Sequence, residues 1–118
     1  MAVSSSSETS KPPPVPMEYY PVAVLRGLDK VAAKAERFLA PVGVPMHFGT
    51  LDVTVRACAK TPPEEKPEAA AYLEINESRQ GTQPVVLFRG WMYASSPSLS
   101  GLEHPVYDLW LLDCQSAK

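Results

Sequence analysis

Thirteen prolines are spread along the 118 residues of this chain, and they limit its secondary structure more than any other feature. The number is roughly twice the usual share, because proline makes up about 5% of an average protein. Proline cannot donate a backbone hydrogen bond, and it breaks a helix when it lies inside one. The sequence therefore predicts many loops and no long helix.

Length and charge limit the fold further and exclude several classes of partner. The chain is 45% apolar and 20% charged, as is usual for a globular protein, and it is long enough for one domain. Its net charge is −2 and it has no block of lysines and arginines. Neither nucleic acid nor an anionic lipid surface is therefore expected as a partner, and no run of apolar residues is long enough to span a membrane.

The first 18 residues are expected to be a disordered Ser/Pro-rich tail, followed by a single β domain over residues 19–118. The opening "MAVSSSSETSKPPPVP" has no apolar stretch that could be a signal peptide. It is, however, typical of the sequence that follows a signal-peptide cleavage site, because it is small, polar and unable to form a core. We expect an exported, periplasmic protein; the alternative is a cytoplasmic protein with a flexible tail.

Apolar residues alternate with polar ones in several short runs bounded by turn residues, which predicts β-strands. The expected strands lie at 21–27, 51–58, 69–77, 85–95 and 106–114. Alternation places Leu51, Val53 and Val55 on one face and Cys58 on the other. About six or seven strands predict an all-β fold, either a small β-sandwich or a partly open barrel. Gly90 is the expected position of a bulge.

The segment near 29–39 gives two signals. Its apolar residues fall at helical spacing behind Asp29, a possible N-cap, and it is rich in alanine, so a short helix is possible here. A weaker alternation from Val31 to Glu36 favours a strand. The local pattern alone prefers the helix.

The two cysteines, Cys58 and Cys114, each end a strand-like run and lie 56 residues apart. This spacing does not fit a CxxC redox pair or a zinc knuckle. A disulfide is the natural interpretation, and it would stabilise the fold by about 4 kcal/mol on the chain-entropy model. Two reduced cysteines in the core are the alternative.

The serine-rich loop before the last strand offers groups that could form a catalytic triad, with His104 as the base. The motif G-x-S-x-G is missing, and so short a chain leaves few elements to build an oxyanion hole. We therefore assign no catalytic residue and treat the loop as a candidate interaction surface. The candidate interaction residues are Ser95, Ser96, Pro97, Ser98, Leu99, His104, Glu64 and Glu65. Glu64 and Glu65 belong to a second, proline-rich loop, which is suited to partner recognition.

Metal and cofactor sites are not expected. His47 and His104 are far apart in sequence and have no ligand pair at short spacing. Trp91 and Trp110 are expected in the core, which leaves Tyr19 and Tyr20 as the freest surface aromatics.

Several runs resemble a known family. They are "VLRGLDKV" (24–31), "FGTLDVTVRAC" (48–58) and "LFRGWMYASSPSLSGLEHPVYDLWLLDC" (87–114). Together they are similar to the small alphaproteobacterial proteins grouped as domain-of-unknown-function family 2155, over about residues 22–114. The resemblance implies a signal peptide, and therefore export. It supplies no activity or catalytic residue, and it favours a strand over 31–40.

These observations predict a non-enzymatic binding or structural protein of the cell envelope, with a protein partner and no cofactor. The first alternative is a small envelope hydrolase that uses the 95–108 loop. The second is a carbohydrate- or peptidoglycan-binding module that uses the exposed aromatics. The oligomeric state is open.

Overall fold

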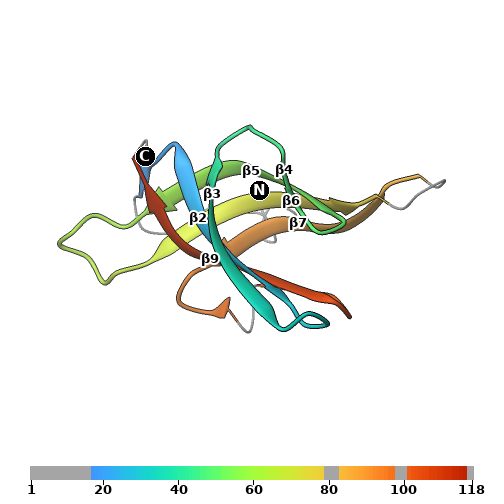
Figure 1. The fold of residues 1–118 in the computed structure, drawn as a ribbon. Helices are drawn as coiled ribbons and strands as arrows, with labels where there is room; N and C mark the ends of the chain where they lie inside the picture. The colour runs from blue at the N-terminus through green and yellow to red at the C-terminus, as the bar shows by residue number, and fades with distance from the viewer. Residues whose placement is uncertain (1–16, 79–82, 98–100, 117–118) are drawn as a thin grey trace, which may run out of the picture.

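The computed structural model describes residues 17–78, 83–97 and 101–116, and these ranges form two antiparallel β-sheets packed face to face (Figure 1). The expected all-β fold is thus confirmed, and the architecture is a sandwich rather than a closed barrel. Six long strands carry the two sheets and three very short ones extend their edges. Within the described ranges, no helix has the length and apolar character needed to cross a membrane.

The first sheet contains five of the described strands and is centred on β5 and β6. Its strands are β1 (Glu18–Tyr19), β4 (Met46–Phe48), β5 (Leu51–Lys60), β6 (Ala69–Glu77) and β7 (Val85–Tyr93). The order is β1-β5-β6-β7, and β4 also pairs with β5. Because β1 and β4 both lie against β5, β7 forms the opposite edge of the sheet.

The second sheet lies in front of the first in Figure 1 and crosses it obliquely. Its strands are β2 (Val22–Asp29), β3 (Lys34–Pro41), β8 (Leu102–Glu103) and β9 (Tyr107–Gln115). The order is β3-β2-β9-β8, so β2 and β9 are the central strands. The first long strand of the domain, β2, is therefore paired side by side with the last strand, β9.

The possible helix near 29–39 is wrong, because this segment is the turn and second strand of a hairpin. Asp29 accepts hydrogen bonds from the backbone N–H groups of Val31 and Ala32, both at 3.0 Å, and so closes the turn. From Lys34 onward β3 pairs with β2 along its whole length. Pairing with a central strand satisfies the backbone and packs Phe38 against the core, and this outweighs the helix propensity of alanine.

The core lies between the sheets and is built from the inward residues of both. Leu51, Val53 and Val55 of β5 meet Leu109 and Leu111 of β9, and all five are nearly inaccessible to solvent. Burial of a leucine or valine side chain stabilises a fold by about 1.5–3 kcal/mol. The alternation in the sequence identified these residues correctly.

Two β-bulges turn both cysteines into this core. On β5 the register against β6 shifts between Val55 and Ala57, so Arg56 is an extra residue and the following residues change face. On β9 the register against β2 shifts around Leu112 in the same way. Without the bulges, strict alternation would point Cys58 and Cys114 outward; with them, both are fully buried and form a disulfide that joins the two sheets.

The prediction of a bulge at Gly90 in the long strand β7 was also wrong. Gly90 pairs in regular register with Leu73, and the irregularity instead lies opposite Ile75 and Asn76, near Leu87. The extra residue is accommodated closer to the start of β7, where the strand is more exposed.

The tryptophans do not lie in the core, contrary to expectation. Trp91 is half-buried, and its ring packs edge-on against that of Tyr72, with centroids 5.6 Å apart. Its neighbour Met92 points the other way into the core. Trp110 is half-buried and lies opposite Leu109 and Leu111 in the alternation, on the outer face of the second sheet. The strands are apolar on both faces because neighbouring side chains partly cover their outer faces.

Candidate functional site

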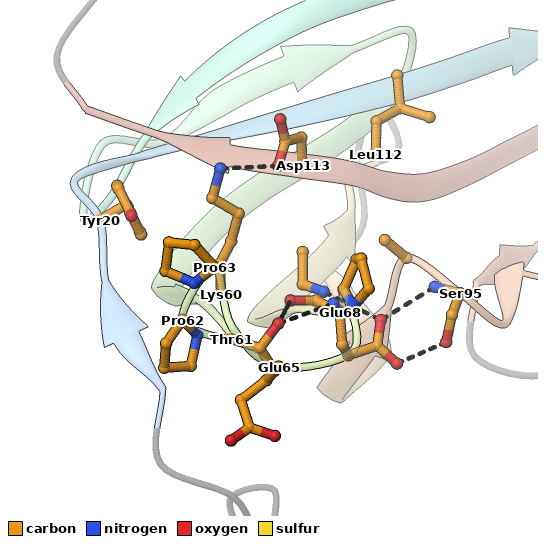
Figure 2. Close-up of a pocket in the computed structure, with 13 residues that line it drawn as sticks. Tyr20, Lys60, Thr61, Pro62, Pro63, Glu65, Glu68, Ser95, Leu112 and Asp113 are labelled. Atoms are coloured by element: carbon orange, nitrogen blue, oxygen red, sulfur yellow. Dashed lines mark hydrogen bonds and ion pairs between the residues drawn. The ribbon is translucent and has the colours of Figure 1, made fainter.

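A pocket of about 480 Å³ opens at one end of the sandwich, where four segments of the chain converge (Figure 2). Tyr20 follows β1, and residues 60–69 span the end of β5, the following loop and the start of β6. Ala94 and Ser95 follow β7, and Leu112 and Asp113 come from β9. The volume lies within the range of small-ligand pockets, which is about 300–1,000 Å³.

The loop between β5 and β6 forms one wall, and it is held in shape by Thr61. The backbone N–H of Thr61 donates to the carbonyl of Glu68 at 3.0 Å, and the Thr61 hydroxyl accepts from the N–H of Glu68 at 3.0 Å. The same hydroxyl donates to the carbonyl of Lys66 at 3.0 Å. Pro62, Pro63 and Pro67 restrict the remaining backbone freedom. Ligand binding would therefore require little ordering of this wall.

Glu68 ties this loop to the segment after β7. Its carboxylate accepts hydrogen bonds from the Ser95 hydroxyl, from the Ser95 backbone N–H at 3.1 Å and from the Ala69 N–H at 3.0 Å. Figure 2 shows Ser95 directed at this carboxylate across the pocket mouth. The hydroxyl of Ser95 is thus bonded to an acceptor that fixes structure, not to an imidazole that could activate it.

Lys60 forms the opposite side of the pocket together with Tyr20 and Asp113. Its ammonium lies 3.4 Å from Asp113 Oδ1 and 5.0 Å from the centre of the Tyr20 ring. The ammonium is therefore neutralised by a carboxylate and also positioned over an aromatic face. The pocket thus combines an apolar wall of prolines and one tyrosine with a few charged side chains in fixed positions. This combination is suited to binding a ligand. None of the lining residues is a histidine or cysteine, the usual activated base or thiol nucleophile.

The structure brings some of the candidate interaction residues together and separates others. Ser95 and Glu65 line the pocket, whereas Glu64 lies on the same loop but outside the lining. Ser96 and Pro97 continue from Ser95 along the chain. Ser98 and Leu99 lie outside the described residues.

His104 lies far from Ser95. Its ring contacts Glu77, at the end of β6, whereas Ser95 contacts Glu68, just before β6 begins. Nine strand residues separate these two contacts by about 30 Å. Ser95 is therefore out of reach of the His104 ring, and these two residues do not form a nucleophile–base pair.

The surroundings of His104 fix its tautomer. Its Nδ1 accepts the backbone N–H of Val106 at 3.0 Å, so the proton is on Nε2, which donates to Glu77 Oε1 at 3.2 Å. The other oxygen of Glu77 accepts from the Thr50 hydroxyl at 2.7 Å. Glu77 is only 5% exposed. This network joins the two sheets at the end away from the pocket, and its partners give it a structural role.

His47 lies on the short edge strand β4, and its side chain is exposed. Its Nδ1 lies 2.7 Å from Asp52 Oδ1. Over the described ranges, no three histidine, cysteine or acidic side chains gather as metal ligands would.

Sequence reasoning missed three residues of the pocket that matter most: Lys60, Glu68 as a cross-link between loops, and Asp113. Lys60 and Asp113 each lie at the end of a strand with a cysteine nearby, and no local pattern predicts that they meet. Tyr20 was identified only as a surface aromatic. The expected disulfide brings the ends of these two strands together, and it is the sequence signal that could have located the pocket.

Comparison with known proteins gives a family but no activity. Residues 23–114 match the model of a family described as "Uncharacterized protein conserved in bacteria (DUF2155)". The uncharacterized protein RP359 of Rickettsia prowazekii is 32% identical over 87 residues, which cover 74% of this chain and 56% of that protein. The chain thus spans little more than half the length of this relative. No solved structure matches the chain.

Proposed function

We propose that this chain, which belongs to the DUF2155 family of bacterial proteins, is a non-enzymatic binding protein of the cell envelope that holds a segment of a protein partner in the pocket beside Tyr20. One observation carries the proposal. The pocket has a preformed wall of prolines and an aromatic ring, and its hydrogen-bonding groups hold the loops in place instead of activating a nucleophile.

The chemistry of the pocket favours a short peptide segment as the ligand. Prolines and Tyr20 offer flat apolar contacts, and Glu65 places an exposed negative charge at the rim. A segment with an apolar side chain next to a basic one would be complementary to this surface. Because the wall already has its shape before the ligand binds, the entropic cost of binding stays low.

The Cys58–Cys114 disulfide supports a periplasmic location. A buried disulfide that joins two sheets forms and persists in an oxidising compartment, and such bonds are rare in the bacterial cytoplasm. Thiol trapping tests this point: cells are lysed in acid, and free thiols are labelled with a maleimide of high mass. We expect no labelled protein without prior reduction. A protein labelled twice before reduction would contradict export.

Binding is tested by comparing two adjacent charge reversals in the same loop. Glu65→Lys changes the pocket rim, whereas Glu64→Lys makes the same charge change outside the lining. Each protein is immobilised and exposed to an envelope extract from the source bacterium. We expect the wild type and Glu64→Lys to retain the same partner. Glu65→Lys should retain at least tenfold less of this partner.

A second pair of variants tests the apolar part of the pocket. Tyr20→Ala removes the aromatic wall, and Tyr19→Ala removes its neighbour, which is 65% exposed and does not line the pocket. Loss of the partner is expected only for Tyr20→Ala. Equal retention by all four variants would show that the partner binds elsewhere.

A further inference from the structure

The outer face of the second sheet carries an apolar cluster that is separate from the core. Val22 and Val24 of β2 are 6% and 1% exposed, yet neither belongs to the core cluster between the sheets. They alternate with Ala23 and Leu25, which do belong to it, and therefore point outward. Half-buried apolar residues of β2 itself and of the adjoining strands β3 and β9 lie next to them. These neighbours are Leu28, Leu39, Trp110 and Leu112.

Two arginines lie side by side on the same face. Arg26 is directly opposite Arg37 on β3 and directly opposite Trp110 on β9, so the three form a row across the sheet. Neither arginine has an ion pair within the described ranges. Like charges directly opposite one another on adjacent strands are destabilising. A guanidinium pair of this kind is favoured when an external carboxylate approaches it.

The same face carries its acidic residues on the other central strand. Asp108 and Asp113 of β9 lie on either side of the row that contains Trp110, in register with Leu28 and Val24. The side chain of Asp113 is 52% exposed, so it can accept a second cation besides Lys60. The face is thus divided into a basic half on β3 and β2 and an acidic half on β9, in which Asp108 is already paired with Lys30 at 3.1 Å.

We propose that this face is a dimer interface that binds a second copy of the chain. A two-fold axis parallel to the strands and between β2 and β9 lays β2 of each protomer over β9 of its partner. Arg26 of one protomer then lies over the partner's Trp110 and within side-chain reach of the partner's Asp113. Because the axis repeats the contact, the basic half of each face meets the acidic half of the other.

The size of the face fits a weak, reversible dimer. Eight residues of β2 extend about 26 Å, and β3, β2 and β9 with their side chains are about 15–20 Å wide. Each protomer therefore contributes a footprint of roughly 400–500 Å², which lies at the low end of specific interfaces. Arginine and tryptophan are the residues that most often dominate such contacts. The dimer shares Asp113 with the pocket, but the inference does not depend on a ligand in the pocket, and Arg26, Arg37 and Trp110 do not line it.

Sedimentation velocity over a range of protein concentrations from about 1 µM to 500 µM tests the proposal with the full oxidised chain. We expect a monomer–dimer equilibrium for the wild type and at least tenfold weaker association for Arg26→Glu. Asp113→Arg should weaken association by a similar factor, for the complementary reason. Glu65→Lys, at the pocket rim, should leave association unchanged, which separates this proposal from the binding function.

Mixing the two charge-reversed chains gives the most specific result. Arg26→Glu and Asp113→Arg each place like charges across their own dimer, but a heterodimer of the two pairs opposite charges at both ends. An equimolar mixture should therefore dimerise at concentrations where each variant alone is monomeric. A wild type that stays monomeric throughout, or a dimer that is insensitive to Arg26→Glu, would overturn the proposal. Circular dichroism of each variant establishes that it is folded.

Discussion

Gly27 lies on β2 directly against the ring of Phe48, and its lack of a side chain makes this contact possible. A Cβ atom at this position would lie 2.5 Å from Cζ of Phe48 and 2.7 Å from both Cε atoms. The ring cannot easily move aside, because it stacks on Phe38 at 5.8 Å and meets Tyr107 edge-on at 5.5 Å. Nothing in the local sequence distinguishes this glycine from the others, so its role could not be predicted.

Gly27→Ala is expected to lower the free energy of unfolding by about 1–3 kcal/mol, the usual cost of overpacking a core. Gly90→Ala is the matched control, because it is also a strand glycine and the nearest atom to its added Cβ is 4.0 Å away. Urea unfolding followed by tryptophan fluorescence measures both. Equal stability of the two variants would contradict the described packing of Phe48.

Glu77 is the buried charged residue on which the end of the sandwich away from the pocket depends. It accepts from both Thr50 and His104, so its removal would leave a buried Nε2–H without an acceptor. Glu77→Ala should cost about 2–4 kcal/mol of stability. Glu64 is exposed, so Glu64→Ala should change stability by less than about 0.5 kcal/mol. The same urea titration tests the pair, and a neutral Glu77→Ala would show that the network is not stabilising.

At the scale of elements, alternation located the long strands well but failed where bulges interrupt it. The strand over 69–77 was predicted to the residue, and β5 and β9 nearly so. Yet a strict period of two placed Cys58 on the same face as Asp52 and Thr54, away from the core. The bulge at Arg56 depends on pairing with β6, which is a long-range property that a local pattern does not contain.

The prediction of a helix over 29–39 failed for a related reason. Alanine favours a helix in isolation, but pairing with β2 in the hairpin stabilises this segment as a strand. Strand propensity depends strongly on neighbouring strands, so a segment of this kind is decided by tertiary context. The family resemblance favoured the strand that the structure has.

The disulfide is the strongest single link between the two sheets, because it joins β5 to β9. Replacing both cysteines by alanine should lower the free energy of unfolding by about 3–5 kcal/mol, since the closed loop is long. Chemical unfolding of the variant and the wild type gives this difference. Added reductant should destabilise the wild type and leave the variant unchanged. Equal stability of wild type and variant without reductant would contradict the role of the bond.

At the scale of the whole molecule, the pocket is formed by residues that are far apart in the sequence. Tyr20, Lys60, Ser95 and Asp113 come from four segments, and the sandwich brings their strand ends to one corner. The sequence identified the two loops that contribute, around Glu65 and Ser95, as candidate interaction surfaces. It could not predict that Glu68 joins them, because that contact spans 27 residues. His104 was grouped with the serine-rich loop around Ser95 by its sequence position, and it belongs to the other end of the fold.

The central claim is that this corner binds a partner in the cell envelope, and site-specific photocrosslinking in living cells tests it most directly. A benzophenone amino acid replaces Glu65 at the pocket rim or, as a control, Val31 in the β2–β3 turn, which is 79% exposed and lies at the opposite end of the second sheet. Irradiation should give one discrete adduct in the envelope fraction from the Glu65 position and none from the Val31 position. The same adducts from both positions, or no adduct from Glu65 at any expression level, would contradict the account.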